Sequence, residues 1–331
     1  ATFRVGTDLE DVTINGTVTH NNGDTVDIFN ALTLNGDWNI NGDNATTSLL
    51  FHGNQTLTSD TTGTINLSNS ANNQLRNSGI NDILTIGNDV TVKGAGTLVA
   101  NFGGLINNGT IRADQTTRLI IDTDTEGFEN RGNVRVLGTG GLRSVGDFLQ
   151  TAGTTTVDST LEFTASGALL LHGGLLEGSG LITGDVLNTG GTVNTGNSPG
   201  TLTINGDYEQ TLGGTLLIEI SGTANGQFDV LQVNGDATLG GTIEVALLGS
   251  PGFAVGQTFD VLFANNIFDS FANSTVSAGS ANFDVSIISG ATDFVRLTAT
   301  SAVPLPPAIW LFLSTTCALL IRSRRAAPGS A

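Results

Sequence analysis

Short segments in which apolar and polar residues alternate recur along almost the whole chain. Representative segments are TINLS (64–68), RLIID (118–122) and TIEVALL (242–248), which are rich in Val, Ile, Leu and Thr. Before residue 303, no segment keeps the i, i+3, i+4, i+7 apolar spacing of an amphipathic helix over two turns. Asn-Gly, Gly-Asp and Gly-Gly pairs separate the segments, and these residues tolerate the positive φ angles of tight turns. The pattern therefore predicts an all-β fold.

Two recurring sequence patterns decide between the possible β folds. The first occurs as LTLNGDW (32–38), LTINGDY (202–208) and LQVNGDA (231–237), and the second as NNGTIRAD (107–114) and NRGNVRVL (130–137). The last two copies of the first pattern lie 29 residues apart, and the copies of the second lie 23 residues apart. Imperfect repeats of this length are typical of successive coils of a β-solenoid. We therefore predict a right-handed parallel β-helix (β-solenoid). The alternative is a β-sandwich or a tandem of two, with strands about every 8 to 12 residues and no internal similarity.

The pattern changes at residue 250, where the chain becomes rich in Phe and its strands become longer. A solenoid end exposes unpaired strand edges and an open core, so we interpret this segment as a β cap. The sequence thus divides into solenoid repeats (1–249), the cap (250–301) and a tail (302–325). The tail contains a predicted short hydrophobic helix (308–321), and a disordered end follows it (326–331).

Charge and cysteine content exclude several classes of function. The 12 Lys and Arg residues include three in the tail, whereas all 30 Asp and Glu residues precede residue 302, so residues 1–301 carry a formal charge of −21. A body this acidic does not follow a phosphate backbone, and we predict no nucleic-acid partner. The only cysteine, Cys317, lies in the tail, which excludes disulfides and thiol chemistry from the body.

The tail combines a proline motif, an apolar segment and a basic cluster. The motif VPLPP consists of Val303, Pro304, Leu305, Pro306 and Pro307, and the basic cluster consists of Arg322, Arg324 and Arg325. Residues 308–321 would form about 21 Å of helix against a hydrocarbon thickness of about 30 Å, so we expect marginal membrane insertion. The arginines would hold the C-terminus on the cytoplasmic side and place the body outside.

This arrangement resembles the PEP-CTERM sorting signal of Gram-negative bacteria, in the variant that begins VPLPA, with Pro307 in place of its Ala. The resemblance implies an exosortase, a membrane cysteine protease, as a processing partner that cuts near the proline motif. It also implies export, anchoring in the inner membrane before processing, and delivery to the cell surface or the extracellular matrix. The alternative is an ordinary short C-terminal membrane anchor.

The body has a resemblance of its own. The segment SPGTLTINGDYEQTLGGTLLIEISG (198–222), with the later QTFDVLFA (257–264) and DFVRLTA (293–299), is similar to the passenger repeats of autotransporter adhesins. The fold of that family is a parallel β-helix, which the resemblance implies for this chain. An autotransporter-type passenger is therefore an alternative function. The membrane β-barrel of autotransporters is not found in the sequence, so we expect a different anchor.

Few residues offer catalytic or metal chemistry. His20, His52 and His172 fit neither a catalytic triad nor a metal-ligand spacing, and each is expected at the surface or in a turn. Neither the GGxGxD calcium nonapeptide nor the EF-hand pattern occurs. We therefore predict no metal, no cofactor and no enzymatic activity. The alternative is a β-helix polysaccharide lyase or glycosidase, which would need Asp with Arg or Lys in a groove, and the single Lys93 disfavours it.

One local feature indicates a ligand. When NNGTIRAD is aligned with NRGNVRVL, Arg112 and Arg135 fall at the same place in adjacent repeats. If the coils stack in that register, the two guanidinium groups come within about 5 Å, which is unfavourable unless an anion or a carboxylate such as Asp114 lies between them. We interpret Arg112 and Arg135 as a candidate anion-binding pair for an acidic glycan. The alternative is neutralisation by Asp and Glu. Three more arginines lie nearby in sequence: Arg118, Arg131 and Arg143.

These observations predict an exported, non-enzymatic structural or adhesive protein of the cell surface or biofilm matrix. Stacked coils offer a long face of repeated Asn, Thr and Asp groups. Such a face would bind an extracellular polysaccharide, or another protein, weakly at each coil but many times over.

Overall fold

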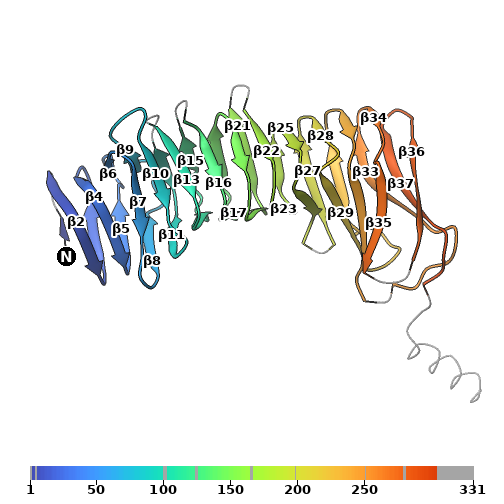
Figure 1. The fold of residues 1–331 in the computed structure, drawn as a ribbon, viewed down its shortest axis with the longest axis horizontal. Helices are drawn as coiled ribbons and strands as arrows, with labels where there is room; N and C mark the ends of the chain where they lie inside the picture. The colour runs from blue at the N-terminus through green and yellow to red at the C-terminus, as the bar shows by residue number, and fades with distance from the viewer. Residues whose placement is uncertain are drawn as a thin grey trace, which may run out of the picture.

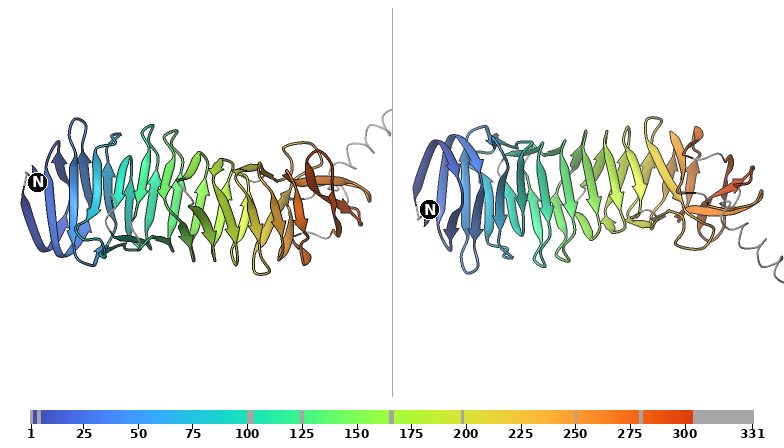
Figure 2. Two further views of the ribbon diagram at one scale, coloured as in Figure 1. Left: turned by 90° about the horizontal axis from the view of Figure 1, so that it is seen from above. Right: turned by 90° about the horizontal axis from the view of Figure 1, so that it is seen from below.

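The computed structural model is an elongated stack of short β-strands, with its N-terminal and C-terminal coils at opposite ends (Figure 1). Figure 2 shows the same stack from two further sides. The structure describes residues 2–3, 6–99, 103–123, 126–164, 167–197, 199–249, 251–278 and 281–303. Within these residues the regular structure is β-strand, and the predicted all-β parallel solenoid is confirmed. No helix in this part of the chain could span a bilayer, and the predicted helix (308–321) lies outside the described residues.

Three faces enclose the core, and from β6 to β35 each coil contributes one strand to each face in turn. Face 1 is a 13-stranded sheet within the described residues. Its strands are β1 (Thr2–Phe3), β3 (Val18–Asn21), β5 (Asp37–Asn41), β8 (Gly63–Leu67), β11 (Val90–Lys93), β14 (Thr110–Ala113), β17 (Asn133–Val136), β20 (Thr154–Val157), β23 (Leu175–Gly178), β26 (Thr192–Thr195), β29 (Thr215–Ile220), β32 (Thr242–Leu247) and β35 (Asn273–Ala278).

Faces 2 and 3 are two parallel stacks joined at the N-terminal end by the long strands β2 (Thr7–Asn15) and β4 (Thr25–Asn35). Face 2 contains β6 (Thr47–His52), β9 (Asn73–Asn77), β12 (Gly96–Val99), β15 (Leu119–Asp122), β18 (Leu142–Val145), β21 (Thr160–Thr164), β24 (Leu181–Thr183), β27 (Thr201–Asn205), β30 (Val230–Val233) and β33 (Thr258–Ala264). Face 3 contains β7 (Gln55–Thr58), β10 (Ile83–Ile86), β13 (Gly104–Asn107), β16 (Phe128–Asn130), β19 (Phe148–Gln150), β22 (Ala168–Leu171), β25 (Asp185–Asn188), β28 (Tyr208–Gln210), β31 (Ala237–Leu239) and β34 (Ile267–Asp269).

The alternation seen in the sequence separates the core from the surface. In β14, Ile111 and Ala113 are buried, whereas the side chains of Thr110 and Arg112 are half-exposed, because successive side chains of a strand point to opposite sides of its sheet. The parallel register then places aliphatic residues of successive coils next to one another, so that Ile111 lies between Val92 and Val134. Such aliphatic ladders form one continuous core.

A second ladder, made of amides, supports the corner between faces 3 and 1. Asn107, Asn130 and Gln150 are register partners with no exposed surface. Asn107 Nδ2 donates to Asn130 Oδ1 at 2.8 Å and to the carbonyl of Asn133 at 3.1 Å. Gln150 Nε2 donates to the carbonyl of Leu175 at 2.9 Å. The buried amides therefore donate to the carbonyl groups of the first residues of β17 and β23.

The repeated Asn-Gly-Asp sequence also has a structural reason. Asp185, which follows Thr-Gly, and Asp207 and Asp236, which belong to two copies of this motif, lie at the start of face 3 on successive coils. The Oδ1 atom of each accepts a hydrogen bond from the following coil, from Asp207 N (2.8 Å), Asp236 N (2.8 Å) and Asn266 Nδ2 (2.7 Å) respectively. In the copy LTLNGDW, Asp37 instead begins β5 on face 1. The same motif therefore serves two different corners of the coil.

Among the strands that the structure describes, antiparallel pairing between whole strands occurs at the C-terminal end, and isolated antiparallel bridges join Gly178 to Gly196 and Ile220 to Phe228. Parallel stacking continues past residue 249 through β33, β34 and β35. Strand β37 (Asp293–Ala299) then pairs antiparallel with β33, and β36 (Phe283–Ile288) pairs antiparallel with β37. Beside these strands, the rings of Phe228, Phe253, Phe259 and Phe283 pack with centroid distances between 5.4 and 6.1 Å. This aromatic cluster covers apolar core at the end of the stack.

Candidate functional site

Three basic side chains follow one another on the solvent side of face 1. Lys93 ends β11, Arg112 lies on β14 and Arg135 lies on β17, and the register places Lys93 opposite Arg112 and Arg112 opposite Arg135. Neighbouring strands lie about 4.8 Å apart, so one cation occurs per coil over three coils. We call Lys93, Arg112 and Arg135 the basic ladder. Like charges that face each other across strands destabilise a sheet, and an anion bound along the basic ladder would relieve that repulsion.

Carboxylates neutralise the basic ladder only in part. Asp114 Oδ2 lies 2.9 Å from Arg112 Nε, although that Nε makes no aligned hydrogen bond, so the contact is an ion pair without hydrogen-bond geometry. The Arg112 side chain remains 42% exposed. Among the described residues, no carboxylate forms an ion pair with Lys93 or Arg135. Arg135 is also an exposed residue, which leaves its guanidinium group accessible to a ligand.

A lane of hydroxyl and amide groups runs beside the basic ladder. Thr91, Thr110, Asn133 and Thr154 are register partners. The first three each lie two residues before a member of the basic ladder, and Thr154 lies two residues before Thr156. A shallow depression of about 410 Å³ continues from Arg135 toward β23, and it is lined by Thr110, Asn133, Arg135, Thr154, Thr156 and Glu177. Hydroxyl and amide groups both donate and accept hydrogen bonds. The lane therefore places partners for sugar hydroxyls next to cations.

The other arginines that the sequence brings near this region are held by carboxylates elsewhere. Arg131 makes two hydrogen bonds of 2.7 Å to Glu129, and these bonds hold the pKa of the Glu129 carboxyl below its usual value. Arg118 and Arg143 share Glu162, with N–O distances of 2.7 and 3.0 Å. Neutralisation by acidic residues thus applies to these three arginines and, through Asp114, to Arg112.

The predicted sorting motif is described only at its first residue. Val303 N donates to Phe253 O at 3.0 Å, and Phe253 N donates to Val303 O at 3.1 Å, so Val303 is tied to the cap. The remaining residues of the predicted sorting signal lie outside the described residues: Pro304, Leu305, Pro306, Pro307, Arg322, Arg324 and Arg325.

The expectation that all three histidines lie at the surface or in turns is wrong for His20. This ring has no exposed surface; Trp38 Nε1 donates to His20 Nδ1 at 3.3 Å, and His20 Nε2 donates to Asp24 O at 3.0 Å. Burial lowers the pKa of His20, which keeps the ring neutral. His52 is half-buried and His172 is exposed. No group of three or more His, Cys, Asp or Glu within the described residues could hold a metal ion.

The sequence alignment missed Lys93 as a member of the basic ladder. The signal was present, because TVK (91–93), TIR (110–112) and NVR (133–135) share a polar residue two positions before the basic one. It was hidden because the segment between Lys93 and Arg112 is shorter than that between Arg112 and Arg135. The loops differ in length from coil to coil, so the spacing between equivalent residues varies. A search for a fixed repeat spacing therefore misses residues that the strand register aligns.

Comparison with known proteins assigns no family to this chain. No protein-family model matches it, and a search of curated proteins finds no match. The function therefore has to be argued from the fold and from the basic ladder.

Proposed function

We propose that the protein is an exported, non-enzymatic structural or adhesive element of the cell surface or extracellular matrix, and that it binds acidic glycans along face 1. The observation that carries this proposal is the basic ladder, which concentrates three cations on consecutive coils of a body with a formal charge of −21. In so acidic a protein, a polyanion is repelled almost everywhere else. The basic ladder would therefore determine where it binds.

The chemistry of the proposed binding follows from the geometry of face 1. Arg112 and Arg135 present planar guanidinium groups, which bind carboxylates through paired hydrogen bonds, and Lys93 adds a point charge. The lane of hydroxyl and amide groups beside them supplies hydrogen-bond partners for the hydroxyl groups of the sugar rings. A polyuronate repeats both kinds of group along its length, so several weak contacts act together on one rigid surface.

Delivery to the cell exterior is part of the proposal and rests on the tail. The motif at 303–307, the apolar segment at 308–321 and the three terminal arginines follow the order of the sorting signal that the tail resembles. In this proposal an exosortase-type protease recognises the tail while the apolar segment holds the protein in the inner membrane. The body is then released to the surface or the matrix.

The test of glycan binding is a titration of polyuronate oligomers into the purified protein at low ionic strength. The double variant Arg112→Ala/Arg135→Ala should bind at least tenfold more weakly than the parent, because each charge-assisted hydrogen bond contributes about 1.5 to 3 kcal/mol. Binding by the parent should also weaken steeply as salt is added, since surface charge attraction is screened.

A matched control separates the basic ladder from overall charge. The double variant Arg131→Gln/Arg143→Gln loses the same two positive charges away from face 1 and should bind as the parent does. If both double variants lose binding equally, or neither does, the assignment to face 1 fails. The same samples test for enzymatic activity, because chain cleavage of the oligomers by the parent would replace the adhesive role with that of a polysaccharide lyase or glycosidase.

A further inference from the structure

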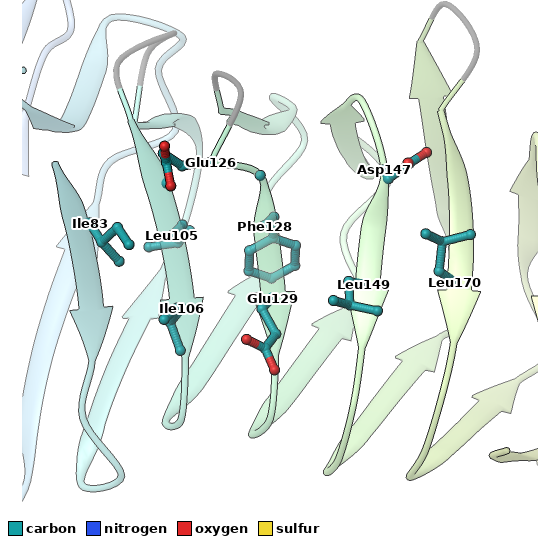
Figure 3. Close-up of a pocket in the computed structure, with 11 residues that line it drawn as sticks. Ile83, Leu105, Ile106, Glu126, Phe128, Glu129, Asp147, Leu149 and Leu170 are labelled. Carbon is teal, nitrogen blue, oxygen red and sulfur yellow. The ribbon is translucent and has the colours of Figure 1, made fainter. Parts of the chain in front are cut away.

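Face 3 carries an aliphatic stripe on its solvent side, in contrast to the basic ladder of face 1. Ile106, Leu149, Leu170 and Leu187 occupy the same outward position on β13, β19, β22 and β25 and are half-exposed. We call these four residues the aliphatic stripe, and Glu129 occupies the same position on β16. Figure 3 shows Ile106, Leu149 and Leu170 on this face, with Glu129 on the strand between those of Ile106 and Leu149. A solvated face of a sheet usually carries polar residues, so an apolar lane of this length suggests contact with a ligand.

A hollow runs beside the aliphatic stripe, with a lining that extends from Ile83 past Gly127 to Leu170. Ile83 lies opposite Gly104, and a Cβ atom at Gly104 would come within 2.8 Å of Glu126 Cβ, so no side chain fits there without moving Glu126. Gly127, with φ +71°, would place a Cβ in open space with no atom within 4 Å. The hollow has a volume of about 360 Å³, which lies within the size range of small-ligand sites.

Carboxylates border the aliphatic stripe along one side. Glu126, Asp147 and Asp185 lie at or just before the starts of β16, β19 and β25, and we call them the acidic edge. Asp147 and Asp185 each use Oδ1 to accept a backbone N–H of the next coil, at 3.0 and 2.8 Å. A carboxylate has a second oxygen, which can accept from a ligand. Figure 3 shows Glu126 and Asp147 on the same side of the aliphatic side chains.

We propose that the hollow, the aliphatic stripe and the acidic edge of face 3 bind a cationic glycan, a chain of β-linked amino sugars with unacetylated amino groups. Each pyranose ring has an apolar C–H surface that packs on Ile and Leu side chains, and its ammonium group pairs with the acidic edge. The absence of a side chain at Gly127, where a Cβ would stand in open space, lets one ring enter the hollow and approach the backbone. The following rings lie along Leu149, Leu170 and Leu187.

The repeat of face 3 favours a sugar chain over a peptide. Its apolar groups lie on β13, β19, β22 and β25 and its acidic groups on β16, β19 and β25, so their spacings along the stack are multiples of about 4.8 Å. A β-linked pyranose chain advances by a similar length per ring. An extended peptide places side chains on one side only about every 6.6 Å, so it loses register after one coil. The acidic edge also repels polyuronates. Face 3 therefore selects a ligand of the opposite charge to the one proposed for face 1.

The experiment compares two oligomers that differ only in charge. A glucosamine hexamer and its fully N-acetylated counterpart are titrated calorimetrically into the full chain, at a pH where the amino groups are protonated. We expect the glucosamine hexamer to bind at least tenfold more tightly. Equal binding of the two hexamers would overturn the proposal, and so would hexalysine binding as tightly as the glucosamine hexamer.

Variants locate the site without removing buried groups. Gly127→Asn should weaken binding of the glucosamine hexamer at least tenfold, because the new side chain fills the hollow. Asn is chosen because it accepts positive φ angles better than most residues. Gly146→Asn is the matched control, since Gly146 has φ +84° and equally open space but does not line the hollow. Unchanged binding by Gly127→Asn would overturn the proposal. Glu126→Gln should also weaken binding several-fold, and more at low salt than at high salt.

The proposal for face 3 can fail independently of the proposal for face 1. The two sites share no residue, so Arg112→Ala/Arg135→Ala should lose the polyuronate and keep the glucosamine hexamer. Loss of the hexamer in this variant would overturn the face 3 assignment, because it would move the cation-binding site to face 1. If both proposals hold, each molecule links an acidic and a cationic glycan through two faces of the same coils.

Discussion

Asp229 is a buried carboxyl group that ties two coils together. It has no exposed surface. Its Oδ1 accepts a hydrogen bond from Gly200 N and its Oδ2 accepts one from Glu219 N, both at 2.8 Å. Removal from water disfavours the charged form and raises the pKa of Asp229 to about 7, although the two N–H donors oppose this shift. Asp229 therefore titrates near neutral pH in the folded protein.

Asp229 should make the protein less stable as the pH rises toward neutrality. Between the unfolded pKa of 3.8 and the folded value of about 7, the native state binds more protons than the unfolded state, so the free energy of unfolding falls with increasing pH. The loss from this group is at most about 1.4 kcal/mol per pH unit, and it ends above about pH 7. Urea unfolding followed at several pH values from 4 to 8 measures the slope.

The variant Asp229→Asn separates this group from the other acidic residues. It removes the titration, so its stability should depend less on pH across the same window. Its stability at acidic pH should be lower than that of the parent, because the Asn amide offers only one acceptor to the two N–H donors. An identical slope in both proteins would show that Asp229 does not titrate in this range.

At the residue scale, the sequence predicts which residues are neighbours on adjacent strands better than it predicts which polar residues are buried. Alignment of two repeats put Arg112 beside Arg135, and their strands pair in that register, because parallel coils repeat the chain direction. The same reasoning missed the burial of His20, which depends on the partners Trp38 and Asp24. A polar residue is buried when the fold supplies its hydrogen bonds, and a single sequence does not reveal those partners.

The buried amides of Asn107, Asn130 and Gln150, which we call the amide ladder, connect successive coils, so breaking this ladder should weaken several coils at once. In Asn107→Ala, the Oδ1 atom of Asn130 and the carbonyl of Asn133 lose a donor, which should cost about 1 to 3 kcal/mol. We expect a lower urea midpoint and faster amide hydrogen exchange in β13, β14, β16 and β17. Asn108→Ala is the control, since no hydrogen bond of the Asn108 side chain occurs within the described residues, and it should stay close to the parent. Equal effects of the two substitutions would contradict a structural role for the ladder.

At the element scale, the repeats predict that coils stack but not how each coil is divided. Alternation identified strands such as 64–68 and 242–248, and both lie on face 1. The three faces depend on where the corners fall, and the Asn-Gly-Asp motif marks two different corners. The end of the parallel stack is equally hard to predict from the sequence. Strand β33 pairs parallel with β30 along one edge and antiparallel with β37 along the other. Pairing at two edges leaves no separate signal in a strand sequence.

At the scale of the whole molecule, the stack keeps opposite chemistries on different faces of the same coils. The basic ladder runs over β11, β14 and β17 on face 1, whereas the aliphatic stripe runs from β13 to β25 on face 3. Inward positions are fixed by packing and could be predicted from alternation. Outward positions are free of packing, so their chemistry reflects function rather than fold, and only the register shows which of them form a surface.

The fate of the tail is the last prediction for the whole molecule. If an exosortase-type protease processes the protein, the cut should fall after Val303, because the backbone of Val303 is hydrogen-bonded to Phe253 and a protease needs its substrate backbone unpaired. Mass spectrometry of the exported protein in its native cell should find a C-terminus between residues 303 and 307. An intact Arg325 in that fraction would contradict sorting, and a C-terminus before Val303 would contradict protection by the cap. The variant Phe253→Pro removes both the N–H donor to Val303 O and a ring of the aromatic cluster, so it should loosen this part of the cap and move the cut toward the body.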